Sequence, residues 1–136
     1  MKFRPAASAG VLALAATAGL FSAGSAAAAV SGGGCTSSYL NGALVQSCVS
    51  ATGATSIQGA AYTSDSVHNS VYLCVEIVNA QGAAVANSER CAEVDAYHGS
   101  VIGPSVSVPS GAYRNVAWFT AGSSYAAVNS PSIAVS

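Results

Sequence analysis

Apolar and polar side chains alternate in short segments from residue 30 to the end of the chain. A period of two is typical of strands with one buried face, and Gly, Pro, Ser and Asn interrupt the segments where turns are expected. No segment in this part has the 3.6-residue period of a helix. Besides two hairpins, the pattern predicts strands at Ser56–Tyr62, Ser100–Val108, Ala112–Thr120 and Ser132–Val135. The domain is therefore expected to be all-β.

A turn signal near the start of this region predicts the first hairpin. Asn41-Gly42 is the strongest two-residue hairpin signal, because both residues accept the positive φ of a type I′ turn. A hairpin centred there places Cys35 directly opposite Cys48.

A second turn signal gives a similar result. Gly82-Ala83 fits a type II′ turn with glycine in its first position. The register that it sets places Glu76 opposite Glu89 and Cys74 opposite Cys91.

Both registers put the paired cysteines at non-hydrogen-bonded positions of their ladders. There the Cα atoms approach to about 4.5 Å, which is within the range of a disulfide. All four cysteines follow residue 29, and none has the CxxC-type spacing of a metal site. The sequence therefore predicts two disulfides, Cys35–Cys48 and Cys74–Cys91, and no metal.

The parity of the second hairpin also predicts what surrounds its disulfide. Cys91 shares a face with Glu89 and Glu93, so this disulfide is expected on the outer, solvated side of its sheet. A cluster of these carboxylates with Glu76 would bind a cation weakly, but a solvated acidic face is the favoured interpretation. By the same alternation the side chain of Arg90 would point toward the core, which only a bulge in the strand would explain.

A short motif indicates how the strands are connected. Val106–Tyr113 resembles the tyrosine corner of immunoglobulin-like sandwiches, in which a Tyr at the start of a strand donates a hydrogen bond back across a Greek-key corner. Asn115 stands where antibody domains carry a cysteine, so their inter-sheet bridge is absent. We therefore expect a Greek-key immunoglobulin-like sandwich of about seven or eight strands. Its thin core of Val and Ala explains the need for two cross-strand disulfides.

The only tryptophan lies in the same strand as this Tyr, and strand parity decides which face it takes. If Tyr113 faces inward, Asn115 does too, and Trp118, Arg114 and Val116 form an exposed stripe. Such a stripe is a candidate binding surface, because Trp and Arg are enriched at binding hot spots. In the alternative, Trp118 and Val116 face the core and Asn115 is solvated. The polar character of Asn115 favours this alternative.

Residues 1–29 have the order of a secretory signal peptide. Lys2 and Arg4 supply the positive start, and Ala6–Phe21 is a nearly unbroken apolar run. The small residues that follow fit cleavage before Val30, and cuts after Ala27 or Ala28 fit almost as well. The run has about 16 residues, fewer than the ~20 that span a bilayer. We expect a secreted protein without a membrane span and with a single domain at residues 30–136.

Composition and charge exclude several classes. The chain is 51% hydrophobic and 7% charged, which is the reverse of a disordered composition. After residue 29 it has two arginines, five acidic residues and no lysine, a net charge of −3. A nucleic-acid-binding protein needs a basic patch, which these residues do not supply.

The candidates for catalysis are weak. His68 and His98 are the only histidines, and the chain contains no GxSxG motif. Asp95 lies three residues before His98, but two possible ligands do not make a metal site. The sequence predicts neither an enzyme nor a bound cofactor.

Residues 30–136 resemble the small secreted two-disulfide β-sandwich proteins of actinomycete type. The likeness rests on the Ala-rich signal, the size, the low charge, the two short-range disulfides and the corner at Tyr113. This class includes enediyne-binding chromoproteins of the neocarzinostatin kind and small hydrolase-inhibiting proteins. A chromoprotein would imply a hydrophobic cleft between the sheets. An inhibitor would imply a rigid exposed loop, at Ser64–Ser70 or His98–Pro104.

The rigid scaffold without a catalytic constellation predicts a secreted, non-catalytic binding protein that contacts a partner protein, as an inhibitor or an assembly subunit. A small-molecule or carbohydrate carrier is the alternative, with a stacking Trp118 as its clue. A structural coat protein, or a secreted domain without a specific ligand, is a further alternative.

Overall fold

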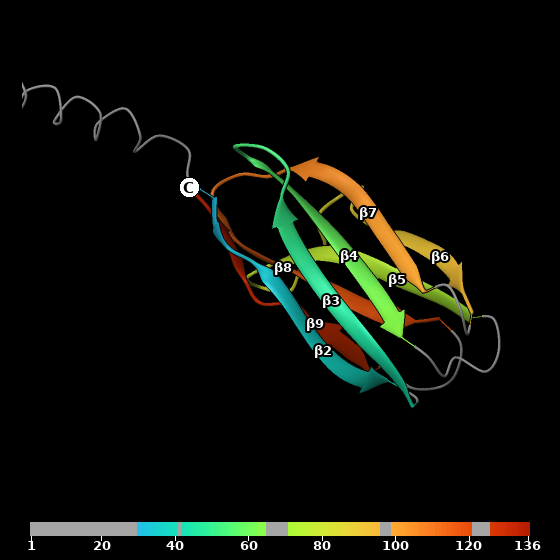
Figure 1. Ribbon diagram of the computed structural model, residues 1–136. Helices are drawn as coiled ribbons and strands as arrows, with labels where there is room; N and C mark the ends of the chain where they lie inside the picture. The colour runs from blue at the N-terminus through green and yellow to red at the C-terminus, as the bar shows by residue number, and fades with distance from the viewer. Residues whose placement is uncertain (1–29, 41, 65–70, 96–98, 121–125) are drawn as a thin grey trace, which may run out of the picture.

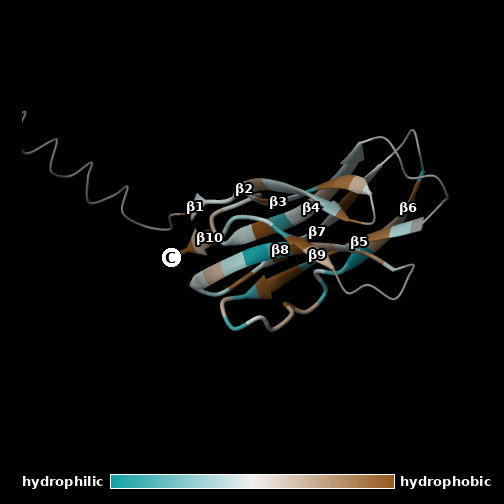
Figure 2. Cartoon of the chain, turned by 90° about the horizontal axis from the view of Figure 1, so that it is seen from below, coloured by the Kyte–Doolittle hydropathy of each residue, from teal (hydrophilic) through white to brown (hydrophobic). Residues whose placement is uncertain are grey.

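The computed structural model of the protein describes residues 30–40, 42–64, 71–95, 99–120 and 126–136. These residues form ten strands in two antiparallel sheets that lie face to face (Figures 1 and 2). The all-β prediction is confirmed. The expected number of seven or eight strands is too low, because two strands of only three residues, Val30–Gly32 and Ala127–Asn129, give almost no alternation to detect.

We call the larger layer sheet A. It has the order β1 (Val30–Gly32), β10 (Ile133–Val135), β8 (Gly111–Phe119), β5 (Val71–Asn79) and β6 (Arg90–Val94), and β9 (Ala127–Asn129) also pairs with β8. The smaller layer, sheet B, has the order β2 (Gly34–Leu40), β3 (Ala43–Ala51), β4 (Ser56–Ser64) and β7 (Ser100–Ser107).

The first hairpin has the predicted register. Leu40 lies opposite Ala43, and Cys35 lies opposite Cys48. Gly42 has a φ of 84°, as its place in the turn requires. The two cysteines form a disulfide with their Cα atoms 4.1 Å apart, so the pairing predicted from the turn is confirmed.

In the second hairpin the predicted turn is wrong, although the predicted disulfide is correct. The Asn79 N–H donates to the Ala83 carbonyl, and Val78 pairs with Ala84. This is a three-residue loop with Gly82 at a φ of 84°, a common alternative to the two-residue turn. Its register is offset by three residues from the one that the type II′ turn predicts.

An irregular segment after the turn compensates for this three-residue difference in register. Asn87 has a positive φ of 63°, and the buried Ser88 hydroxyl accepts the Ile77 N–H at 3.0 Å. Cys74 and Cys91 are thereby brought opposite each other and form the second disulfide.

Arg90 follows the same irregular segment. The alternation of the strand would direct its side chain into the core, but Arg90 lies on β6, at the edge of sheet A, where the side chain does not have to be buried. Arg90 lies opposite the fully buried Val75, yet its own side chain is exposed. Its Nη1 donates to the Ile102 carbonyl of β7 at 3.4 Å. The guanidinium therefore bridges the two sheets at their shared border instead of entering the core.

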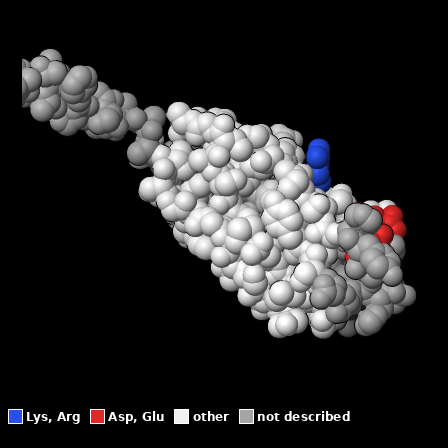
Figure 3. Space-filling view, in the orientation of Figure 1, with Lys and Arg blue, Asp and Glu red and all other residues white. Residues whose placement is uncertain are grey.

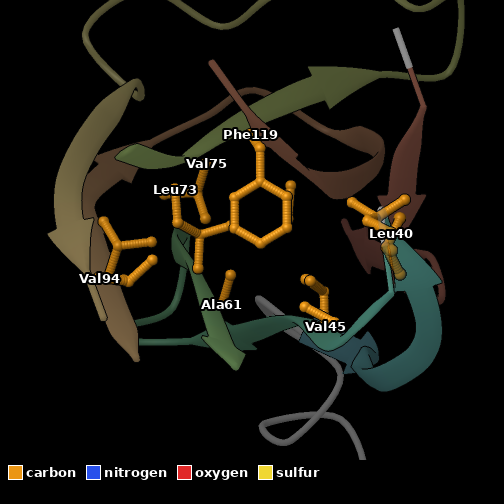
Figure 4. Close-up of a cluster of buried hydrophobic side chains, with 11 residues drawn as sticks. Leu40, Val45, Ala61, Leu73, Val75, Val94 and Phe119 are labelled. Atoms are coloured by element: carbon orange, nitrogen blue, oxygen red, sulfur yellow. The ribbon is translucent and has the colours of Figure 1, made fainter. Parts of the chain in front are cut away.

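The core between the sheets consists of two apolar clusters. In the first, Phe119 of sheet A points toward Val45 and Ala61 of sheet B (Figure 4). In the second, Ile77 and Ile133 of sheet A meet Ile57 of sheet B. Burial of this apolar surface is the main favourable term in folding.

A polar layer separates the two clusters, and Asn115 is its centre. The fully buried Asn115 of β8 donates through Nδ2 to the Ser47 Oγ of β3 at 2.9 Å and to the Ala60 carbonyl of β4 at 3.1 Å. The Ser47 hydroxyl donates in turn to the Asn115 carbonyl at 3.1 Å. We call this set the Asn115 clasp, because it joins sheet A to sheet B at the middle of the sandwich.

The clasp requires a glycine on the facing strand. A Cβ at Gly59 of β4 would collide with the Asn115 amide and approach Ile77 Cδ1 to 3.2 Å. Gly59 also lies at the register shift between Gln58 and Ala60, where β4 pairs with β7. The lack of a side chain at this bulge lets the two sheets approach closely.

Replacing the buried amide is expected to destabilise the fold. Asn115→Ala leaves the Ser47 hydroxyl and the Ala60 carbonyl without this partner, which costs about 2–3 kcal/mol of unfolding free energy. Urea denaturation followed by circular dichroism measures the change. Asn129→Ala is the matched control, because the exposed Asn129 amide accepts only from Arg114 Nε at 3.0 Å. An equal loss in both variants would contradict the clasp.

Candidate binding face

All four strands of sheet B lack charged residues. No Asp, Glu, Lys or Arg occurs in β2, β3, β4 or β7. Figure 3 views the molecule from the side on which sheet B lies in Figure 1, and the coloured charged side chains gather at one end of the view. The outer surface of this sheet is therefore neutral.

Three of the large apolar side chains that the structure exposes lie on this surface. Tyr39 is 72% exposed, and Tyr62 and Ile102 are each 41% exposed. Strand parity places them on the outer side, because their neighbours Leu40, Ala61 and Val101 are buried in the core. We call the outer surface of sheet B the tyrosine face, formed by Cys35, Ser37, Tyr39, Leu44, Gln46, Cys48, Ala60, Tyr62 and Ile102.

The registers of sheet B fix how these side chains lie relative to one another. One row across the strands contains Ser37, Gln46, Tyr62 and Ser100. The next row contains the Cys35–Cys48 disulfide, Ala60 and Ile102.

A shallow hollow opens beside the first of these rows. It has a volume of about 150 Å³ and is lined by Ser37, Leu44, Gln46, Tyr62, Thr63 and Ser64. Residues that carry an amide, hydroxyl groups and an aromatic ring therefore line one depression on this surface.

The sheet that carries this face is braced by covalent and hydrogen bonds. The Cys35–Cys48 disulfide ties β2 to β3, and Gln58 Nε2 donates to the Gly103 carbonyl of β7 at 2.8 Å. On the inner side the Asn115 clasp holds β3 and β4 against sheet A. The tyrosine face is therefore positioned by a rigid sheet.

The stripe predicted from strand parity lies on the opposite side of the molecule. Tyr113 and Asn115 are buried, and Arg114, Val116 and Trp118 are half-buried on the outer face of sheet A. The preference for a solvated Asn115 was wrong, because Asn115 is fully buried and its Nδ2 donates to Ser47 and Ala60 inside the sandwich. Its Oδ1 faces the Gly59 backbone and has no hydrogen-bond partner among the described residues. The binding role of Trp118, Arg114 and Val116 stays a prediction.

The neighbours of this stripe limit what it presents to a partner. Trp118 lies directly opposite Cys74, and the Arg114 Nε–H donates to Asn129 Oδ1. The indole therefore lies beside a fully buried half-cystine in the sheet, and the guanidinium is engaged within the chain. The tyrosines of sheet B are more exposed than the residues of this stripe, so they are better placed to contact a partner.

A pair of carboxyl groups lies near the second disulfide. The pKa of Glu76 is raised above its ordinary value of 4.5 by burial, by repulsion from Glu89 and by a hydrogen bond with the Glu89 side chain. The second carboxylate is thus part of what disfavours the charged form of Glu76.

Several predicted features fall outside the described residues. They are the signal segment 1–29, both histidines and most of the loop Ser64–Ser70. The other proposed loop, His98–Pro104, is corrected in part, because Ser100–Pro104 belongs to β7. In the part of the chain that the structure describes, no group of three or more His, Cys, Asp or Glu side chains is placed to hold a metal ion.

The tyrosine face was not predicted from the sequence. The first hairpin register already put Tyr39 on the same parity as the disulfide, and residues 30–64 contain no charged residue. These two signals together would have indicated a neutral surface. Tyr62 and Ile102 were not predictable as neighbours, because they become so only when β4 pairs with β7.

Comparisons with protein-family models, with curated proteins and with solved structures found no match. The resemblance to small secreted actinomycete proteins therefore stays a prediction. Among the described residues, no helix is long and apolar enough to cross a membrane.

The carboxyl pair makes stability depend on pH. Because the folded protein holds the Glu76 proton more tightly than the unfolded chain, this stabilising contribution is complete below pH 4.5 and is lost as the pH rises through the folded-state pKa. Glu89→Gln removes the repulsion, so we expect it to raise the unfolding free energy at neutral pH by about 0.5 kcal/mol, with little effect below pH 4.5. Urea denaturation at the two pH values measures this.

Glu93→Gln is the control, since it removes the same charge from an exposed position of β6. It should change stability less than Glu89→Gln does. Equal gains at neutral pH would show that the general negative charge, and not the pair, is responsible.

Proposed function

We propose that the protein is an extracellular, non-catalytic binding protein that contacts a partner protein through the tyrosine face. The observation that carries this proposal is the exposure of Tyr39, Tyr62 and Ile102 on four strands that contain no charged residue. The centres of protein interfaces are depleted of charged side chains and enriched in aromatic ones. The tyrosine face has this composition.

The hydrogen-bonding groups of the face also suit a protein partner. Gln46 and Ser37 are exposed, and their side chains contact each other only at 3.5 Å, so both remain available to external donors and acceptors. Tyr supplies apolar area and a hydroxyl with few rotatable bonds, which lowers the entropy lost on binding. No charge on this face has to be desolvated when a partner covers it.

The rigidity of sheet B supports the same conclusion. Affinity depends strongly on how little the interacting surfaces must reorganise, because ordering of side chains and loops opposes association. The disulfide at the centre of the face and the clasp beneath it order the surface before a partner arrives.

We further propose that residues 1–29 are a signal peptide that directs export, and that the sandwich has an immunoglobulin-like Greek-key topology. Two disulfides support export, since disulfides persist in oxidising compartments. The Tyr113 hydroxyl donates to the Pro109 carbonyl at 2.8 Å, which supports a tyrosine corner.

A neutral carbohydrate is the second candidate ligand, favoured by the hollow beside Tyr62. Gln46, Ser37, Ser64 and Tyr62 are among the residues that line it, and they carry an amide, two hydroxyls and an aromatic ring. Sugar hydroxyls would find donors and acceptors there, and the ring offers an apolar surface for a sugar face.

Truncation of Tyr62 is the direct test of the proposed function. The oxidised protein is immobilised and exposed to the proteins of its own culture medium, and the dissociation constant of the retained protein is then measured. Tyr62→Ser is expected to weaken binding about thirtyfold, since loss of a central aromatic side chain costs about 2 kcal/mol.

Tyr72→Ser is the matched control, because Tyr72 is 52% exposed but lies on β5 of sheet A. It should leave the affinity unchanged. Loss of binding with Tyr72→Ser and not with Tyr62→Ser would overturn the proposal. Saturable binding of a neutral oligosaccharide, lost in Tyr62→Ser and without change in Trp118 emission, would instead identify the second candidate.

A further inference from the structure

The free edges of the two sheets differ in how they are protected against strand pairing. An unpaired edge strand exposes a row of N–H and C=O groups and is a template for another strand, so proteins usually protect edges with charge, proline, bulges or short length. Among the strands that the structure describes, β1, β6 and β9 are edges of sheet A, and β2 and β7 are edges of sheet B.

Four of these edges have a recognisable protection. β1 and β9 have only three residues each, and β6 has five residues, of which Arg90 and Glu93 are charged. β7 contains Pro104, faces a bulge in its pairing with β4, and has the carbonyl of Ile102 occupied by Arg90 Nη1.

The fifth edge, β2, has none of these protections. Its sequence, Gly-Cys-Thr-Ser-Ser-Tyr-Leu, has no charge and no proline, and its register with β3 is continuous over all seven residues. The side chains from Cys35 to Tyr39 are all exposed. The edge is therefore long, regular and accessible.

The geometry of the hairpin shows which backbone groups point away from β3. Cys35 and Cys48 have their Cα atoms 4.1 Å apart, the spacing of a non-hydrogen-bonded pair. Since pairs alternate along an antiparallel ladder, the N–H and C=O groups of Cys35, Ser37 and Tyr39 all point to the open side. Within the described residues, no strand pairs with them there.

We propose that the β2 strands of two copies of this chain pair antiparallel about a two-fold axis at Ser37. In that register Ser37 lies opposite Ser37 of the second copy, and Cys35 lies opposite Tyr39 of the second copy. Each of these three residues then exchanges both backbone hydrogen bonds with its opposite residue. All the outward-pointing groups of both strands are satisfied, and the two-fold arrangement closes without leaving a β2 edge open.

The two neighbouring registers, with the two-fold axis at Cys35 or at Tyr39, are less favourable because fewer free backbone groups of β2 would be paired. A two-fold axis at Cys35 would place Ser37 opposite Gly33, but the Gly33 N–H already donates to the Ser132 carbonyl at 2.8 Å. An axis at Tyr39 would carry the pairing past the end of β2 at Leu40. The axis at Ser37 is therefore the one that uses the whole strand.

Side chains and charge are compatible with this pairing. The neutral strands meet without repulsion between like charges, which would oppose direct self-pairing of a charged strand. The exposed Tyr39 ring would lie beside the Cys35–Cys48 disulfide of the second copy, and aromatic rings make favourable contacts with sulfur. The two sheets B would then form one eight-stranded neutral surface.

This inference goes beyond the proposed function, because it rests on the backbone edge of β2 and not on the ligand of the tyrosine face. The test is the molar mass of the oxidised protein by sedimentation over a range of concentrations. We expect a species of twice the monomer mass that dissociates on dilution. A monomer up to the highest soluble concentration would overturn the proposal.

Ser37→Pro tests the register. It removes an outward N–H and leaves the hydrogen bonds of β2 with β3 intact, since proline is tolerated where the N–H of an edge strand faces solvent. The variant should be monomeric with its circular dichroism and both disulfides retained. A dimeric Ser37→Pro variant would contradict pairing at this edge.

Charge substitution at the two-fold axis gives a test that does not depend on proline. Ser37→Lys and Ser37→Glu should each be monomeric, because like charges would lie directly opposite each other, and mixing the two should restore the doubled mass. Ser50→Lys is the matched control, since it adds a charge to an exposed site on β3 away from the edge, and it should stay dimeric.

Failure of the mixture to reassociate while the wild type is dimeric would assign the dimer to another surface. Tyr62→Ser separates the two proposals, because it should weaken partner binding and leave the doubled mass unchanged.

Discussion

The arrangement of the two sheets depends on the hydrogen bonds of the buried Asn115 amide. It joins β8 of sheet A to β3 and β4 of sheet B in a layer between two apolar clusters, which by themselves would tolerate sliding of one sheet over the other. A buried donor that loses its hydrogen bond incurs its full desolvation cost, so the two hydrogen bonds of Asn115 Nδ2 favour one register of the sheets, although Oδ1 stays unpaired among the described residues. Gly59 is part of the same constraint, because only its missing side chain leaves room for Asn115.

That register decides what each outer surface carries. With Ser47 and Asn115 turned inward, Gln46 and Cys48 must face out on sheet B, and Arg114 and Val116 must face out on sheet A. The charged side chains of the described strands then belong to sheet A, and sheet B is left neutral. The proposed binding face and the proposed pairing edge both lie on sheet B, so both depend on how β3 and β4 are held from beneath.

The all-β class and the first disulfide were predictable from the sequence because they follow from local signals. Asn41-Gly42 fixes the register of its hairpin within the hairpin itself, whereas the second cysteine pair was predicted correctly from a turn that the structure does not contain. The irregular segment around Ser88 restores the register that brings the two cysteines together. The hydrogen bond between Ser88 and Ile77 that holds this segment cannot be predicted from a local sequence pattern. Local patterns also give no sign of the Asn115 hydrogen bonds, because its partners Ser47 and Ala60 lie 68 and 55 residues away in sequence. Tyr62 and Ile102 likewise become neighbours only in the assembled sheet.

The central claim is that the tyrosine face is the surface that a partner covers. Oxidative footprinting of the tyrosines, read by mass spectrometry, tests it most directly when the protein in its own medium is compared with the purified, dilute protein. Tyr62 is expected to be protected in the medium, and Tyr72, which has similar exposure on sheet A, is expected to be modified equally in both samples. Protection of Tyr72 with Tyr62 modified equally in the two samples would contradict the account.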